Sequence, residues 1–380
     1  MSTRGFYDDA VVGAGIIGLA HAYQLARRGR RVIVFERNVR AVGASVRNFG
    51  MLWPIGQPLG FRRAIAQKSL LFWLEVLSAS GLWCERAGSL HLAYRDDEAQ
   101  VIQEFARECL LNGENVKLLN PCEVLACASA VNADGLELGL FSPSEVCVDP
   151  REIITGLPQW LSRSFGVVFE FGRAITSVEV PFILSGNSKW SASRVWVCSG
   201  DELGLLFPAA MQDAGLVRCK LQMMRSQPVE NDWRMGPLLA AGLTLRHYES
   251  FQNSPSLAAL KDRIARESPW FDRFGIHVMV CQNGLGELTI GDSHEYGLVD
   301  EPFDKTQIDE LILSYLRTFL KAPALRIASR WHGVYVKHQR DPFLILHPAP
   351  GTTVVTGLGG AGMTLSFGLA EAVISQELGE

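Results

Sequence analysis

The sequence has no surplus of positive charge and no apolar run long enough to cross a membrane. Its 36 lysines and arginines are outnumbered by 40 aspartates and glutamates, which gives a formal net charge of −4. Neither a nucleic-acid-binding surface nor a surface for anionic membranes is therefore expected. No stretch reaches the roughly 20 apolar residues that a membrane span needs. We expect a soluble, cytoplasmic protein, and no feature of the sequence indicates its oligomeric state.

Patterns typical of disulfide frameworks and metal sites are also missing. The eight cysteines include no CxxC pair, so in a chain of this length they predict buried, reduced side chains. No pair of histidines or carboxylates has the spacing of metal ligands, and the sequence therefore predicts no metal. Hydrophobic residues make up 48% of the 380 residues, enough for a large buried core.

A strand, a glycine turn, a helix and a second strand are predicted within the first 36 residues. The apolar run 7–12 predicts a buried strand, 19–28 has helical periodicity, and 31–35 is a β-branched run. The turn after the first strand carries a GxGxxG motif made of Gly13, Gly15 and Gly18. This order of elements is typical of a dinucleotide-binding site.

Each residue of the motif has an expected part in holding the dinucleotide. Gly13 permits a tight turn, Gly15 lets the backbone approach a pyrophosphate, and Gly18 lets the helix pack closely on the sheet. Glu36 follows the third glycine by 18 residues and is placed to accept hydrogen bonds from a ribose diol. The motif does not by itself distinguish a nicotinamide cofactor from a flavin.

Further segments favour FAD. The segment 43–54 is too glycine-rich for a helix and too irregular for a strand, and it suits an extended cofactor that must be held along its middle. Predicted strands at 166–171 and 195–200 return to the same domain. A strand at 353–357 leads through a glycine loop into a helix at 367–377. The N-terminus of that helix could stabilise charge on a reduced flavin.

Together these segments resemble the FAD-dependent D-amino acid oxidase superfamily, on its glycine oxidase and sarcosine oxidase side. The resemblance covers most of the chain. It implies an α/β fold in which a Rossmann-type FAD-binding domain (residues 1–85, 145–214 and 325–380) is interleaved with an α+β substrate-binding domain (residues 86–144 and 215–324). The second domain is expected to form a sheet that caps the flavin.

The resemblance also implies which residues contact FAD. They come from the glycine turn, the segment after Glu36, two strand ends and the C-terminal glycine loop. The set is Gly13, Gly15, Ile16, Ile17, Gly18, Glu36, Arg37, Ala44, Ser45, Arg47, Asn48, Gly50, Met51, Leu52, Ala174, Ser199, Gly200, Gly360, Gly362, Met363 and Thr364. Sarcosine oxidases attach flavin through a cysteine whose position here is Gly333, so FAD is expected to be noncovalent.

The chain departs from the family pattern where the substrate binds. Amino acid oxidases of this fold clamp the substrate carboxylate with arginine, but Tyr335 and Gly360 occupy the two arginine positions. An ordinary α-amino acid is therefore not expected. Tyr335 and Lys337 share one face of a predicted strand and precede His338, a set that suits a tetrahedral anion. The candidate catalytic residues are Tyr335, Lys337, His338, Met51, Trp53 and His294.

Two of these assignments have alternatives that the sequence leaves open. His294 lies beside acidic neighbours, which fits a solvated loop or a structural hydrogen bond as well as an active site, and 337–338 also fit an exposed strand end. The segments 47–57 and 291–296 look like a branch of the superfamily linked to aminophosphonate breakdown. By that resemblance the substrate would be an aminoalkylphosphonate or an N-methylated relative.

The reaction implied by the resemblance is oxidation of a C–N bond. Hydride passes from the carbon that bears the amine to the flavin, water hydrolyses the resulting imine to a carbonyl product, and O2 reoxidises the flavin. Sarcosine oxidases place a lysine near the flavin to promote the reaction with oxygen, and its position here is Thr289, which leaves the acceptor open. Three alternatives remain: a flavin dehydrogenase of an amine or hydroxy acid, a flavin-binding subunit of a larger complex, and an NAD-dependent dehydrogenase.

Overall fold

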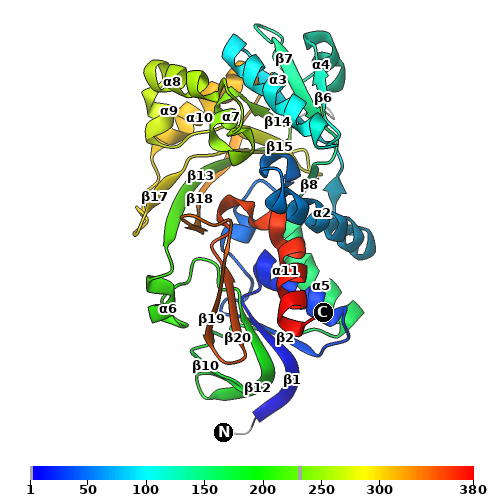
Figure 1. Ribbon diagram of the computed structural model, residues 1–380, viewed down its shortest axis with the longest axis vertical. Coiled ribbons are helices and arrows are strands. Elements are labelled where there is room, and N and C mark those ends of the chain that lie inside the picture. Colours follow the sequence, from blue (N-terminus) through cyan, green and yellow to red (C-terminus); the bar gives the residue numbers. More distant parts are fainter. Residues whose placement is uncertain (1–2, 230–232) are drawn as a thin grey trace.

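Two large β-sheets lie towards opposite ends of the long axis of the molecule, and helices pack against both (Figure 1). The structure, a computed structural model, describes residues 3–229 and 233–380. The mixture of sheets and helices confirms the predicted α/β fold class.

The sheet that contains the N-terminal strand has eight strands. They are β1 (Thr3–Val12), β2 (Val32–Glu36), β9 (Val168–Phe171), β10 (Ser177–Glu179), β11 (Phe182–Ser185), β12 (Ser188–Val197), β19 (Leu344–Ala349) and β20 (Thr352–Thr356). Strand β1 pairs in parallel with β2 and β12, which in turn pair in parallel with β9 and β20. The remaining three strands add antiparallel pairs.

Four long helices accompany this sheet. They are α1 (Ile16–Ala26), α2 (Phe61–Ser80), α5 (Pro150–Phe165) and α11 (Gly362–Leu378). Helix α11 packs between α1 and α2, and α1 also contacts α5. The predicted order of strand, turn, helix and strand is therefore present as β1, α1 and β2, although the helix begins three residues earlier than expected.

The second sheet has nine strands. They are β5 (Ser89–Ala93), β6 (Lys117–Leu119), β7 (Leu138–Ser142), β13 (Leu216–Ser226), β14 (Leu238–Ala241), β15 (Met279–Gln282), β16 (Leu288–Gly291), β17 (Glu295–Gly297) and β18 (Ile327–His338). The other helices are α3 (Asp96–Leu111), α4 (Pro121–Cys127), α6 (Pro208–Gln212), α7 (Gly242–His247), α8 (Leu257–Glu267), α9 (Pro269–Arg273) and α10 (Thr306–Phe319). All of these except α6 lie beside the second sheet (Figure 1).

Strand β18 belongs to a different sheet from the one implied by the domain boundaries predicted from the sequence. It pairs antiparallel with β13 along its length, from Ile327 opposite Ser226 to His338 opposite Leu216. Its hydrogen bonds therefore place it in the second sheet, whereas the predicted division assigned residues 325–380 to the FAD-binding part. This pairing brings Tyr335 and Lys337 to the region between the two sheets.

Short elements connect the two large sheets. Strands β3 (Met51–Leu52), β4 (Cys84–Glu85) and β8 (Val146–Val148) form a small third sheet with β8 in the middle. Four 3-10 turns are η1 (Ala44–Val46), η2 (Pro54–Gly56), η3 (Glu249–Phe251) and η4 (Gly359–Ala361). The segment 43–54, expected to be irregular, thus contains a 3-10 turn and a short strand.

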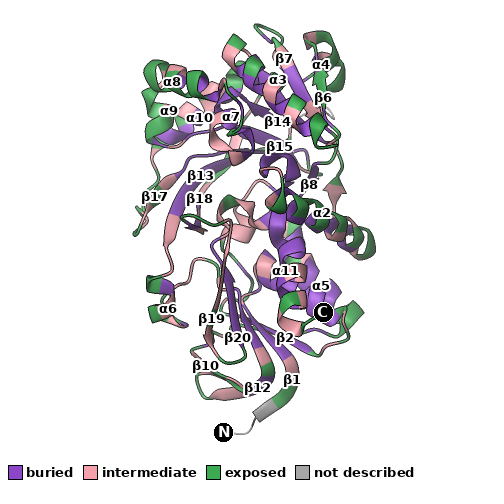
Figure 2. Cartoon of the chain, in the orientation of Figure 1, coloured by how far each residue is buried: buried purple, intermediate pink, exposed green. Residues whose placement is uncertain are grey.

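Buried side chains concentrate on the central strands of both sheets and on the helix faces that cover them (Figure 2). All eight cysteines are unpaired, but Cys122 and Cys127 are exposed, contrary to the expectation that the cysteines are buried. Both lie on the short helix α4 at the surface. No helix among the described residues is long and apolar enough to span a bilayer.

Candidate cofactor and substrate site

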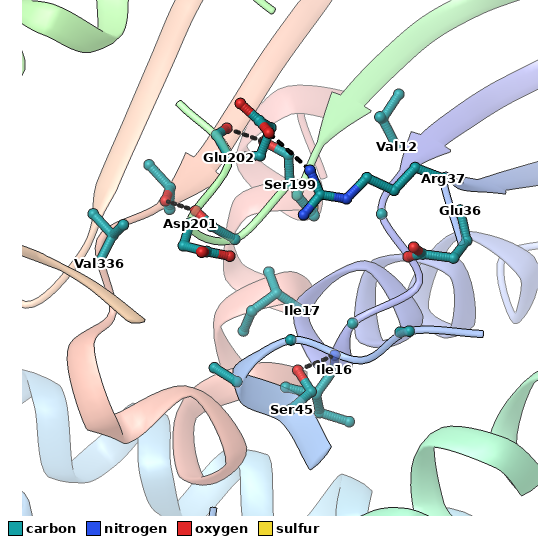
Figure 3. A pocket seen from close by; sticks show the side chains of 18 of the residues that line it. Val12, Ile16, Ile17, Glu36, Arg37, Ser45, Ser199, Asp201, Glu202 and Val336 are labelled. Carbon is teal, nitrogen blue, oxygen red and sulfur yellow. Dashed lines mark hydrogen bonds and ion pairs between the residues drawn. The ribbon is translucent and has the colours of Figure 1, made fainter. Parts of the chain in front are cut away.

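A cavity of about 310 Å³ lies at the carboxyl ends of β1, β2, β12 and β20. Parallel strands present their C-terminal ends at one edge, which is where open α/β sheets bind ligands. The residues predicted to contact FAD that line this first cavity are Gly13, Gly15, Ile16, Ile17, Glu36, Arg37, Ala44, Ser45, Arg47, Ala174, Ser199, Gly200 and Gly362. Figure 3 shows several of them around the opening.

The glycine turn can be built only with glycine at two of its positions. Gly13 has φ +105°, and a Cβ there would lie 2.4 Å from the carbonyl oxygen of Cys198. A Cβ on Gly18 would lie 1.9 Å from the carbonyl oxygen of Gly13. Gly15 is the N-cap of α1 with φ −70°, and its missing side chain leaves the cavity open beside the helix N-terminus. Such a terminus favours an anion.

Polar groups hold the rim of the first cavity in place. The backbone N–H of Ile16 donates to Ser45 Oγ at 3.0 Å, and the N–H of Ala14 donates to Glu36 Oε2 at 3.1 Å. Arg37 extends from the end of β2 to Glu202, with Nη1 2.7 Å from Oε2 (Figure 3). The Glu36 carboxylate is thus fixed at the cavity edge, where the sequence places the ribose.

A second cavity of about 390 Å³ adjoins the first and shares Ser45, Arg47 and Tyr335 with it. It extends between the two large sheets. The candidate residues that line it are Ile16, Ala44, Ser45, Arg47, Asn48, Met51, Trp53, His294, Tyr335, Lys337, His338, Gly360, Gly362, Met363 and Thr364. All six candidate catalytic residues are therefore brought together here.

Three predicted FAD contacts line neither cavity. A Cβ on Gly50 would lie 2.0 Å from the carbonyl oxygen of Val148, so Gly50 faces packed backbone. Leu52 is 1% exposed and belongs to the hydrophobic core around α1 and α11. Gly18 packs against the turn, as expected of the third glycine of the motif. The predicted contacts of Gly50 and Leu52 with the isoalloxazine are not supported by this placement.

The three candidates on β18 have different environments. Tyr335 is 9% exposed, and burial raises the pKa of its hydroxyl well above the ordinary value. Lys337 is half-buried, with Nζ 3.7 Å from Glu249 Oε1. His338 is buried, and its Nδ1 accepts a hydrogen bond from the N–H of Asp341 at 2.8 Å. The interpretation of His338 as an exposed strand end is therefore wrong; it holds the turn after β18.

Three histidines from separate elements meet at the wall of the second cavity. The ring centroid of His247 lies 3.9 Å from that of His277 and 4.4 Å from that of His294. Burial lowers the pKa of His294 to about 4 and that of His247 well below its ordinary value. His294 is 7% exposed, so its interpretation as part of a solvated loop is wrong. Its Nδ1 lies 3.2 Å from the Gly275 carbonyl oxygen, which agrees with the other alternative, a structural hydrogen bond.

Sequence reasoning missed two members of this cluster. His247 ends α7, and His277 precedes β15 by two residues, so neither is near His294 in the chain. The absence of metal-ligand spacing predicted that there is no metal, but three histidines here offer ring nitrogens that all lie within 4.8 Å of one another. Only tertiary structure brings them together.

The charged residues around the second cavity are mostly basic. The basic ones are Arg47, Arg62, Arg246, Lys337 and Arg340, and the acidic ones are Glu249, Asp292 and Asp341. Arg62 pairs with Glu249 at 2.7 Å, and Arg246 is held by Asp272 at 3.0 Å. The excess of positive charge favours an anionic ligand.

Comparison with known proteins assigns the family. Residues 8–376 match the DAO family, described as FAD dependent oxidoreductase. The chain belongs to this family. It therefore is an FAD-dependent oxidoreductase, as the glycine turn and the C-terminal glycine loop predicted.

The curated relatives of the family differ in activity. Glycine oxidase of Geobacillus kaustophilus is 25% identical over 173 residues, covering 43% of this chain and 46% of the relative. Mitochondrial L-2-hydroxyglutarate dehydrogenase of Dictyostelium discoideum is 26% identical over 171 residues, covering 43% of this chain and 38% of the relative. The matched segments thus span less than half the length of either relative.

Solved structures show the same fold over nearly the whole chain. The crystal structure of glycine oxidase from Geobacillus kaustophilus has a TM-score of 0.77 at 18% identity, covering 98% of this chain and 94% of that one. L-proline dehydrogenase from P. horikoshii has a TM-score of 0.80 at 16% identity, covering 99% and 94%. At these identities the likeness supports the two-sheet fold and not a particular substrate.

Proposed function

We propose that this chain oxidises the C–N bond of a small anionic amine or N-methylated amine, with noncovalently bound FAD as the two-electron acceptor. The observation that carries the proposal is the second cavity, which adjoins the cofactor cavity and has a mostly basic lining. In that lining Tyr335 stands where the amino acid oxidases of this fold have an arginine. An aminoalkylphosphonate is the substrate class that this lining favours. A cytoplasmic location belongs to the same proposal.

The residues present fit FAD along both cavities. The first offers Glu36 for a ribose and the N-terminus of α1 for the pyrophosphate. The second reaches the N-terminus of α11, whose first turn (Gly362, Met363 and Thr364) contains no acidic residue. Bound FAD supplies the hydride acceptor and carries the difficult chemical step. Gly333 cannot form a thioether, which favours noncovalent binding.

Residues of the second cavity would bind and orient the substrate. The Nε1–H of Trp53 is buried and has no hydrogen-bond partner among the described residues, so it is available to a ligand. The Tyr335 hydroxyl remains protonated because burial raises its pKa, and it can donate a hydrogen bond. Lys337 adds a mobile positive charge, which suits a tetrahedral anion better than the planar fork of arginine. These groups hold the carbon that bears the amine at the flavin end of the cavity.

The alternative function is a flavin dehydrogenase of an amine or hydroxy acid that uses an acceptor other than oxygen. One curated relative is a hydroxy acid dehydrogenase, and one structural neighbour is an L-proline dehydrogenase. Thr289 stands at the position of the lysine that promotes the oxygen reaction in sarcosine oxidases, and it is buried on β16. We propose O2 as the acceptor, and measurement of peroxide in air distinguishes the two functions.

Anaerobic reduction of the flavin tests the substrate class. Loss of the flavin absorbance band at about 450 nm would be followed with 2-aminoethylphosphonate, β-alanine, propylamine, their N-methyl forms and a set of 2-hydroxy acids. The phosphonate and β-alanine have the same chain length, so the pair compares a tetrahedral with a planar anion. We expect faster reduction by the phosphonates. Reduction only by 2-hydroxy acids would replace the proposal with the alternative.

Variants then test the proposed contacts. Lys337→Ala and Tyr335→Phe should raise KM for the anionic amine by about 10-fold or more, since each removes a charge-assisted or buried hydrogen bond. Lys261→Ala, an exposed lysine on α8 away from the cavity, is the matched control. Unchanged kinetics in both cavity variants would contradict the proposed anion site.

A further inference from the structure

The histidine cluster at the second cavity has the composition of a metal site. His247 comes from the end of α7, His277 from the approach to β15, and His294 from the approach to β17. One ring nitrogen from each lies within 4.8 Å of the other two. All three residues line the second cavity, so the space between the rings is reached from it.

The nitrogen atoms of this cluster are only partly used by protein partners. Nε2 of His277 lies 2.9 Å from Asp292 Oδ1, while its Nδ1 is buried without a hydrogen-bond partner among the described residues. His277 is 2% exposed, so this atom is also hidden from water. The side chain of His247 makes no hydrogen bond to another described residue. Nδ1 of His294 lies 3.2 Å from the Gly275 carbonyl oxygen, which leaves Nε2 of that ring for a ligand. The buried, unpaired Nδ1 of His277 calls for a ligand.

The arrangement around His277 matches a recurrent feature of metal sites. A metal-bound histidine usually donates its second ring N–H to a carboxylate, which fixes the tautomer and the ring orientation. Asp292 Oδ1 lies 2.9 Å from Nε2 of His277 without the alignment of a hydrogen bond, so a small rotation of the ring is needed for that bond to form. Asp292 Oδ2 lies 3.8 Å from Nε2 of His294. In the tautomer that carries the proton on Nε2, which faces Asp292, the unpaired Nδ1 of His277 presents a lone pair.

An anion explains the cluster less well than a cation. An anion would need several N–H donors, but each neutral ring carries only one, and Nε2 of His277 faces Asp292. Protonating the rings to supply more donors would place imidazolium ions with centroids 3.9 Å to 5.1 Å apart, and these would repel one another strongly. A metal ion instead takes the neutral form of each ring. Imidazole ligands favour zinc, copper, nickel and iron over magnesium or calcium.

We propose that His247, His277 and His294 bind one divalent transition-metal ion of the zinc class, with Asp292 orienting His277. In a tetrahedral site the nitrogen atoms lie about 3.4 Å apart, so closing around the ion requires side-chain movements of about 1 Å. Three protein ligands leave a fourth position, which would face the second cavity. The site does not depend on the substrate proposed above, because its ligands are residues of the chain alone.

Titration of the wild-type holoenzyme tests the proposal directly. Purified, chelator-treated protein with its flavin bound would be titrated with Co²⁺, whose visible d–d bands report tetrahedral coordination, and then with Zn²⁺ in competition. We expect one Co²⁺ per chain, displaced by Zn²⁺ and not by Mg²⁺. If the folded holoenzyme binds no Co²⁺ or Zn²⁺ at an excess of metal, the proposal is wrong.

Variants connect the binding to these histidines. His247→Ala and His277→Asn should abolish the Co²⁺ bands, and Asp292→Asn should weaken binding about 10- to 100-fold, as expected of a residue that orients a ligand. His347→Ala is the control, because His347 is exposed and pairs with Glu377. Bound-flavin absorbance confirms folding in each case. Metal binding that survives loss of two of the three histidines would overturn the assignment.

Discussion

Replacing Gly15 with aspartate is expected to prevent FAD binding without preventing folding. Gly15 has φ −70° and ψ 173°, a conformation open to any L-residue. A Cβ there meets only Ser45 Oγ, at 3.1 Å, and that side-chain tip can move. The new carboxylate would enter the first cavity beside the N-terminus of α1, where the pyrophosphate is proposed to bind.

The size of the effect follows from the charge. A carboxylate about 4 Å from a phosphate charge costs about 4 kcal/mol at an effective dielectric constant near 20, and less where water enters. Because each 1.4 kcal/mol is a factor of 10, a penalty of about 2–4 kcal/mol weakens binding about 30- to 1000-fold. Gly15→Asn has nearly the same shape without the charge, so it isolates the electrostatic part of this penalty.

Flavin fluorescence quenching would measure the dissociation constant of FAD for the wild-type, Gly15→Ala, Gly15→Asn and Gly15→Asp apoproteins. We expect small losses for alanine and asparagine and a large loss for aspartate. The difference between Asn and Asp should shrink as salt is raised, since salt screens the repulsion. If the aspartate variant binds FAD as tightly as the asparagine variant, the pyrophosphate does not lie at this helix.

FAD should raise the melting temperature of the apoprotein in proportion to the logarithm of its concentration, because it binds the folded chain alone; differential scanning fluorimetry measures this. Trp73→Phe should cost about 2 kcal/mol of unfolding free energy in denaturant titrations, since the buried Nε1–H of Trp73 donates to the Met363 carbonyl at 2.9 Å. Although burial raises the pKa of Asp149, hydrogen bonds from Arg151 hold it below the usual range. This carboxylate therefore stabilises the fold above about pH 4, and the stabilisation disappears as the pH falls through the lowered pKa. Asp149→Asn should lower the melting temperature at neutral pH, and the melting temperatures of the variant and the wild type should converge in acid.

The cofactor half of the site was predictable because its signals are local. The tight turn at Gly13 and the close packing at Gly18 depend on residues that follow one another in the chain. Glu36 ends the next strand, so its place at the same sheet edge follows from parallel pairing. The same reasoning predicted a helix after the C-terminal glycine loop, although α11 begins at Gly362, five residues earlier than expected. Gly362 lines both cavities.

The substrate half depends on long-range pairing, which local patterns do not encode. Strand β18 joins the second sheet through β13, more than a hundred residues earlier in the chain, and this pairing decides where Tyr335 and Lys337 face. His247 and His277 meet His294 only because α7 and the strand approaches fold onto one cavity wall. Arg246 and Arg62 reach the same cavity from two different helices.

Tyr335 and Lys337, both on β18, are expected to contact different sets of ligands, because only Tyr335 lines both cavities. Tyr335 borders both cavities, whereas Lys337 borders only the second. With FAD in the first cavity and its flavin end reaching the second, Tyr335 would contact cofactor and substrate, and Lys337 substrate alone. Tyr335→Phe should therefore shift the flavin absorbance spectrum of the substrate-free enzyme as well as KM, while Lys337→Ala should change KM and leave that spectrum as it is. A spectrum altered equally by both substitutions would mean that the flavin ring extends further along β18 than the cavity boundaries indicate.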